Sequence, residues 1–439
     1  MNNSINRRSF LKTVTASSLS SLIPMQYALS KDYLNGKTLV VLELSGGNDG
    51  LNTIIPYADD NYYKFRPNIG IRENKLLKID DYFGFNPGIV GLESLYKEGN
   101  MAIIHGCGYD NPSFSHFTSM AYMHTAAPNS GEEYGWLGRL ADHMAPPTHK
   151  NFIINIDKTQ SLAVRSQKHV PIVFDQPQRF QREGFFAQKS ILESEMNTNT
   201  VTSNNNAQNF LNEIANSANE ASSVISEAWS NYTRRVDYGL TPIDLDKIAA
   251  LIEADVPARL YYTSFRDNAF DTHVHQPNLH KRLLTYASDA IRGFMNDLDR
   301  MGKSQDVVLL VMTEFGRRVP ENTSLGTDHG SAGPMFIIGP SVKGGHYGKI
   351  PDLVNGLDDG DNLKYTTDFR SVYATLIDKW LKVDSKSILR KNFQTFDIFD
   401  KTVWYKLLVE LLDNFNYYPV TKYFDCLIRG RKWTYLIKN

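Results

Sequence analysis

The sequence predicts an α/β protein with a mostly parallel central sheet, and three observations lead to that prediction. Short apolar runs of the length of buried strands recur along the chain. Segments with helical periodicity lie between them, which is the alternation typical of parallel α/β folds. The composition is 41% hydrophobic, with 23 Phe and 23 Tyr, which is sufficient for a large packed core.

The apolar runs are the expected strands, and several of them end in glycine or in turn-forming residues. They fall at 38–44, 101–104, 152–154, 170–174, 306–312 and 334–339. Helices are expected at 89–98, 114–126, 136–144, 279–302 and 368–382. Because the runs are apolar almost throughout rather than alternating, we expect a sheet that is buried on both faces.

Residues 1–30 have the layout of a signal peptide. An arginine pair, Arg7 and Arg8, precedes a modest apolar stretch, and 28–30 places small residues where a signal peptidase reads them. The pair indicates the twin-arginine route, with cleavage near Lys31. We therefore expect the twin-arginine translocase as a partner during export and a periplasmic or extracellular location. The alternative, a basic amphipathic first helix, accounts for fewer of these features.

The remaining chain is expected to be one domain at 31–400. Residues at about 180–255 are rich in Asn, Ser, Glu and Ala, which indicates a helical insertion. Residues 401–439 are aromatic and basic without clear periodicity, which indicates a C-terminal extension.

Charge and composition exclude several classes of protein. Lys+Arg 47 against Asp+Glu 48 gives a net charge of −1, without the basic surplus expected of a nucleic-acid binder. No apolar run outside the signal is long enough to span a membrane, so we expect no integral span after cleavage. Cys107 and Cys426 are too few and too far apart for a disulfide framework.

Polar residues that suggest a binding or catalytic site follow the expected strands, where ligands bind in open α/β sheets. Asp49, within the glycine-rich stretch 46–52, is placed to reach a metal or a substrate, although Asn-Asp-Gly is also common in turns. Ser115 and His116 open a helix, where the backbone N–H groups favour a developing anion. Ser115 therefore suggests a nucleophile for phosphoryl or sulfuryl transfer, with a simple helix cap at Ser113 as the alternative.

Two later stretches carry metal-ligating residue types. Asp271, His273 and His275 place three potential ligands for Zn²⁺ or Mn²⁺ within five residues. Glu314 comes directly after the strand expected at 306–312, and the pair 328–329 (Asp-His) lies between glycines before the next strand. The alternative for Glu314 is a simple ion pair with the neighbouring arginines at 317–318.

Five motifs in this order resemble those of a family of exported bacterial proteins. They are Ser-Gly-Gly-Asn-Asp-Gly-Leu-Asn at 45–52, Ser-His-Phe at 115–117, Asp-Thr-His at 271–273, Thr-Glu-Phe-Gly-Arg at 313–317 and Gly-Thr-Asp-His-Gly at 326–330. The family is known only as a domain of unknown function and is distantly similar to sulfatases and alkaline phosphatases. The resemblance spans roughly residues 1–400, including the signal.

The resemblance implies an alkaline-phosphatase-like α/β/α sandwich of three layers, with one or two metal ions at the strand ends. It implies a nucleophile at Ser115 or His116. The ligands that it implies, together with those suggested by the residues above, are Asp49, Asp271, His273, His275, Glu314, Asp328 and His329. The ion would be Zn²⁺, Mn²⁺, Mg²⁺ or Ca²⁺.

The sequence departs from the wider superfamily at Phe315, where a ligand histidine is expected. Either Asp328 or His273 substitutes, or one ion is bound, or the site is degenerate. We expect a metal-dependent hydrolase of phosphate or sulfate esters that takes a small anionic ester, with Arg317 orienting the anion. The alternative is a non-catalytic binding or assembly protein that retains the fold.

Overall fold

The computed structural model describes residues 36–179 and 221–399. The expected signal peptide at 1–30, the expected extension at 401–439 and the first part of the expected insertion at 180–255 lie outside the described residues.

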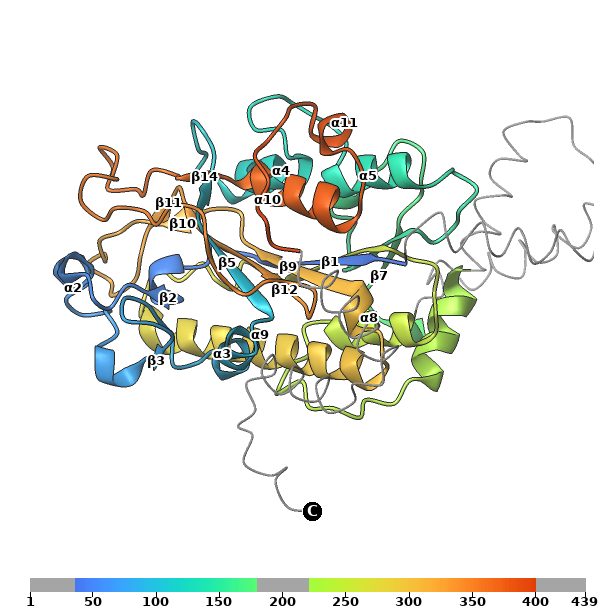
Figure 1. Cartoon of the computed structure of the whole chain (residues 1–439), viewed down its shortest axis with the longest axis horizontal. Helices are drawn as coiled ribbons and strands as arrows, with labels where there is room; N and C mark the ends of the chain where they lie inside the picture. Colours follow the sequence, from blue (N-terminus) through green and yellow to red (C-terminus); the bar gives the residue numbers. More distant parts are fainter. Residues whose placement is uncertain (1–35, 180–220, 400–439) are drawn as a thin grey trace, which may run out of the picture.

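A nine-stranded sheet forms the centre of the molecule (Figure 1). Its strands are β1 (Thr38–Leu44), β5 (Met101–Gly108), β6 (Ile153–Ile156), β7 (Ile172–Phe174), β8 (Leu260–Phe265), β9 (Val307–Met312), β12 (Gly333–Ile338), β13 (Gly345–Tyr347) and β14 (Thr367–Asp368). The order is β13-β5-β12-β9-β1-β8-β6-β7, and β14 pairs with β5. Only β12 pairs antiparallel, with β5 and β9, so the expected mostly parallel sheet is confirmed.

Helices cover both faces of the sheet, which makes three layers (Figure 1). Alternate residues of β1 point to opposite faces, so Val40 and Leu42 belong to one buried cluster and Leu39 and Val41 to the other. The first cluster packs against α3 (Val90–Lys97), α8 (Leu245–Glu253) and α9 (Gln276–Arg300). The second packs against α4 (His116–Thr125), α5 (Trp136–Met144), α10 (Phe369–Thr375) and α11 (Ser385–Leu389).

The smaller elements are not part of the nine-stranded sheet. They are the three-stranded sheet of β2 (Ile54–Ile55), β4 (Gly84–Phe85) and β3 (Leu77–Lys78), the hairpin of β10 (Gly316–Arg317) and β11 (His329–Gly330), and helix α2 (Asp60–Phe65). Short helical turns are η1 (Gly50–Asn52), η2 (Glu73–Lys75), η3 (Leu162–Val164), η4 (Pro177–Arg179), η5 (Ser304–Asp306) and η6 (Leu376–Trp380).

All six expected strands and all five expected helices are present, with shifts at their ends. The sequence prediction missed β8, which lies at the centre of the sheet between β1 and β6. Its sequence, Leu-Tyr-Tyr-Thr-Ser-Phe, mixes aromatic and hydroxyl side chains and lacks the aliphatic run of the other central strands. Residues 221–231 are helical, and Ile225 within them is buried in the core. Among the described residues, no helix is long and apolar enough to cross a membrane.

Candidate metal centre

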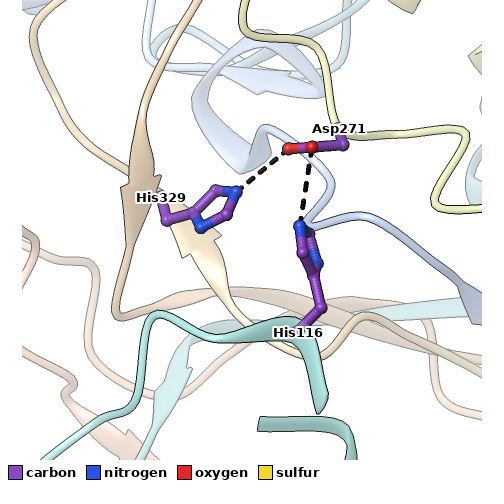
Figure 2. Close-up of side chains that lie close together, drawn as sticks. All are labelled: His116, Asp271 and His329. Atoms are coloured by element: carbon purple, nitrogen blue, oxygen red, sulfur yellow. Dashed lines mark hydrogen bonds and ion pairs between the residues drawn. The ribbon is translucent and has the colours of Figure 1, made fainter. Parts of the chain in front are cut away.

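Three residues from distant parts of the chain bring potential metal ligands together. His116 begins α4, Asp271 lies in the loop before α9, and His329 begins β11. Figure 2 shows the two imidazoles turned toward the carboxylate. One ligand atom of each residue lies within 4.8 Å of those of the other two.

Glu314 fixes the orientation of His116. The buried Glu314 carboxylate lies with Oε1 2.8 Å from His116 Nδ1. This hydrogen bond raises the pKa of His116 despite its partial burial. Glu314 is held in turn by the backbone N–H groups of Gly46 and Gly47, at 2.8 and 3.1 Å. His116 Nε2 is thereby directed toward Asp271 Oδ2, 3.5 Å away.

A backbone carbonyl holds the ring of His329, as the Glu314 carboxylate holds the ring of His116. Its Nδ1 lies 2.7 Å from the carbonyl oxygen of Phe114, and because a carbonyl only accepts, Nδ1 must carry the proton. Its Nε2 lies 3.0 Å from Asp271 Oδ1. Burial lowers the pKa of His329, although the hydrogen bond to Asp271 opposes that effect.

His273 adds a third imidazole to the centre. Its Nδ1 lies 3.2 Å from Asp328 Oδ1, which is also bonded to Asn322. Its Nε2 lies 2.9 Å from both Asp271 Oδ1 and His329 Nε2. Asp328 is therefore linked to Asp271 and His329 through the ring of His273.

The three histidines share one arrangement, in which Nδ1 faces an acceptor and Nε2 faces Asp271. With the protons on Nδ1, Arg317 is the donor that faces this group among the described residues, with Nη2 toward Asp271 Oδ1 and Nη1 3.4 Å from His273 Nε2. The Nε2 lone pairs of His116 and His329 therefore face the carboxylate oxygens without a donor between them. Such a concentration of lone pairs is unfavourable unless a cation, either a proton or a metal ion, lies among them. Metal-binding histidines characteristically donate their other ring N–H to a carboxylate or carbonyl, as all three do here.

Arg317 holds the carboxylate and the glycine loop in place. Its buried guanidinium donates to Asp271 Oδ1 at 2.7 Å, to the Gly47 carbonyl at 2.7 Å and to the Thr327 carbonyl at 2.8 Å. It also donates to the carbonyls of Gly46 and of residue 270. Burial raises the pKa of Asp271, but the bonds from Arg317 and His329 outweigh it and lower that pKa to about 2.

Phe315 packs against the centre as an apolar wall. It is buried, and its ring centroid lies 5.0 Å from that of His116 and 4.5 Å from that of His329. Gly47 makes room for it, because a Cβ at that glycine would lie 2.3 Å from Phe315 Cε2.

Comparison with known proteins places the chain in a family. Residues 36–391 match the profile of a family described as "Protein of unknown function (DUF1501)". The chain belongs to the DUF1501 family. All five motifs lie within the matched residues, so the family resemblance predicted from them is confirmed. A comparison with curated proteins finds no match.

Solved structures similar to this DUF1501 chain are distant in sequence. One is a protein of the alkaline phosphatase superfamily from Vibrio parahaemolyticus, with 12% identity, coverage of 81% of this chain and 70% of that chain, and a TM-score of 0.38. Another is the PsFucS1 sulfatase from Pseudoalteromonas sp., with 12% identity, coverage of 85% and 75%, and a TM-score of 0.35. A third is the C-terminal periplasmic domain of EptC from Escherichia coli in complex with Zn, with 10% identity, coverage of 77% and 81%, and a TM-score of 0.35.

Three of the ten predicted site residues of the DUF1501 chain, Asp49, His275 and Ser115, take no part in the contacts around Asp271 described above. Asp49 is fully buried and forms an ion pair with Arg66 at 2.7 Å. His275 is exposed at the N-terminus of α9. Ser115, rather than Ser113, occupies the N-cap position of α4, and it is exposed. A role for these three residues in binding or chemistry stays a prediction.

Sequence reasoning left two partners unrecognised. The side chains of Arg66 and Gln276 both donate hydrogen bonds to the Asp49 carboxylate, and the sequence indicated neither of them. A single arginine at the end of a short helix gives no pattern that would reveal its partner. Glu314 forms its ion pair with His116 rather than with the arginines at 317–318.

Proposed function

We propose that this DUF1501 protein is a metal-dependent hydrolase of phosphate or sulfate esters. The observation that carries the proposal is the convergence of three anchored imidazoles on one carboxylate. A set of imidazole nitrogens with one carboxylate suits Zn²⁺ or Mn²⁺ better than Ca²⁺ or Mg²⁺, which prefer oxygen. His116, His329 and Asp271 would hold the ion, with His273 beside them.

The chain's own residues would prepare the reaction. A bound ion would supply Lewis-acid stabilisation of charge on the transferred group. Glu314 keeps His116 oriented, and Arg317 keeps Asp271 in position and ionised. Since His116 belongs to the donor set, the exposed hydroxyl of Ser115 beside it is the better candidate for attack on the ester.

Metal analysis and turnover test this proposal together. The purified protein should contain bound metal and hydrolyse an aryl phosphate or aryl sulfate. Asp271→Ala and His329→Ala should lose both properties, whereas His143→Ala, at an exposed histidine of α5, should keep both. Absence of metal after refolding with Zn²⁺, Mn²⁺, Mg²⁺ and Ca²⁺ in turn would refute the proposal.

Phe315 favours a second candidate, a binding protein without turnover. Its buried ring places apolar surface against His116 and His329, where the wider superfamily is expected to have a further ligand. Metal at full occupancy, with no turnover across a broad panel of phosphate and sulfate esters, would support this second function.

We also propose export by the twin-arginine route. The support is the sequence layout of residues 1–30, with the pair Arg7 and Arg8. Replacing both by Lys should leave uncleaved protein in the cytoplasm. A processed double variant in the periplasm would refute this route.

A further inference from the structure

Exposed apolar side chains gather on the segments that build the metal centre. The described residues include ten large hydrophobic side chains that are exposed. Four of them lie on the three segments that carry His116, Asp271 and His329. They are Phe114, Phe117, Val274 and Leu325, with exposed fractions of 41%, 88%, 54% and 39%.

Each of the four is tied closely to the centre. The Phe114 carbonyl accepts the ring N–H of His329, and Phe117 follows His116 in the first turn of α4. Val274 follows His273 directly. The chain at Leu325 runs beside that loop, because the Leu325 carbonyl accepts the backbone N–H of Gln276 at 2.9 Å. Since neighbouring Cα atoms are about 3.8 Å apart, the backbone at Phe117 and Val274 lies directly beside that of His116 and His273.

An isolated exposed apolar residue needs no explanation, but four around one polar centre do. With a metal ion held among its lone pairs, as proposed above, the centre would suit the anionic end of a ligand. These four side chains offer no hydrogen bonds to a polar ligand body, whereas an apolar body would remove them from water.

We propose that the ester cleaved at this centre has an apolar alcohol part, an alkyl chain or an aromatic ring, that lies on Phe117 and Val274. The proposal rests on the function proposed above, in that it places an anionic ester at the centre. Phe114 and Leu325 extend the same apolar surface. These side chains act in substrate specificity and take no part in the bond-breaking step.

Binding of alkyl phosphates tests this without requiring turnover. Calorimetric titration of the full protein with methyl phosphate and octyl phosphate gives the ratio of their dissociation constants. We expect octyl phosphate to bind at least roughly 10-fold more tightly, and Phe117→Ser with Val274→Ser to remove most of that difference. The matched control is Leu240→Ser with Val170→Ser, at side chains that are 81% and 78% exposed on other segments, and it should leave the ratio unchanged.

Equal binding of the two phosphates, or an unchanged ratio in Phe117→Ser with Val274→Ser, would overturn the inference. If esters are hydrolysed, the same double variant should raise KM for an octyl or aryl phosphate and leave kcat nearly unchanged. An octyl preference that depends on Phe117 and Val274, without hydrolysis of any ester, supports the apolar surface while the proposed hydrolase activity fails.

Discussion

The ring of Phe315 lies on the ring of His329, with 4.5 Å between their centroids and 38° between their planes. The same ring lies 5.0 Å from that of His116. Phe315 therefore contacts two of the three candidate metal ligands without being able to bind a metal. If the centre binds metal, the residue at this position would decide whether a second ion could be held beside the first.

Phe315→His should raise the amount of metal bound per chain. A ring nitrogen would replace apolar surface beside His116 and His329, and it could complete a second site provided that a neighbouring group accepts a hydrogen bond from the other ring nitrogen. Elemental analysis of the purified variant measures the change, and Phe315→Leu, which keeps the position apolar, is the control. An unchanged metal content in the folded histidine variant would show that no second site can form there.

Glu314→Gln should weaken metal binding by roughly 10- to 100-fold, because it removes the carboxylate that orients His116. Competition with a chelator would measure the affinity. Glu321→Gln is a matched control, since that carboxylate also accepts backbone N–H groups, those of Asn68 and Ile69. Equal affinities in the two variants would contradict an orienting role for Glu314.

Asp49→Asn should destabilise the fold by roughly 3–5 kcal/mol, because it leaves the buried charge of Arg66 without its partner. Denaturant unfolding measures the loss. Glu93→Gln, which breaks the more exposed ion pair with Lys97 on α3, should cost less than about 1 kcal/mol. We expect the folded Asp49 variant to keep its metal. Loss of metal would instead support the ligand role that the sequence predicts for Asp49.

Gly47→Ala should cost about 2–5 kcal/mol and disturb the centre. The φ of Gly47 is +74°, which costs an L-residue about 1–2 kcal/mol, and the new Cβ would clash with the buried Phe315 ring. Gly131→Ala separates these causes, because Gly131 has φ +67° with nothing within 4 Å of its Cβ position. Equal losses of unfolding free energy in the two variants would show that the contact with Phe315 contributes nothing.

The sequence by itself determined the elements of this protein that depend on local pattern. Near-continuous aliphatic runs such as 307–312 can be satisfied only by burial on both faces, so they reveal the strands and the layered architecture. The strand β8 was not predicted from the sequence, because it has no aliphatic run of its own and is buried through its neighbours β1 and β6. Motif order also determined the family, because the five motifs are short contiguous stretches.

Only the tertiary structure decided how the candidate residues are used. His116 and Glu314 are 198 positions apart, and Asp49 and Arg66 are 17 apart, so nothing local indicates either pairing. The sequence presents Asp49 and Asp271 as equivalent carboxylates. The fold buries Asp49 against Arg66 and leaves Asp271 partly exposed among imidazoles. Residue types limit which chemistry is possible, but partners and burial set the charge and direction of each side chain, and those depend on how distant segments pack.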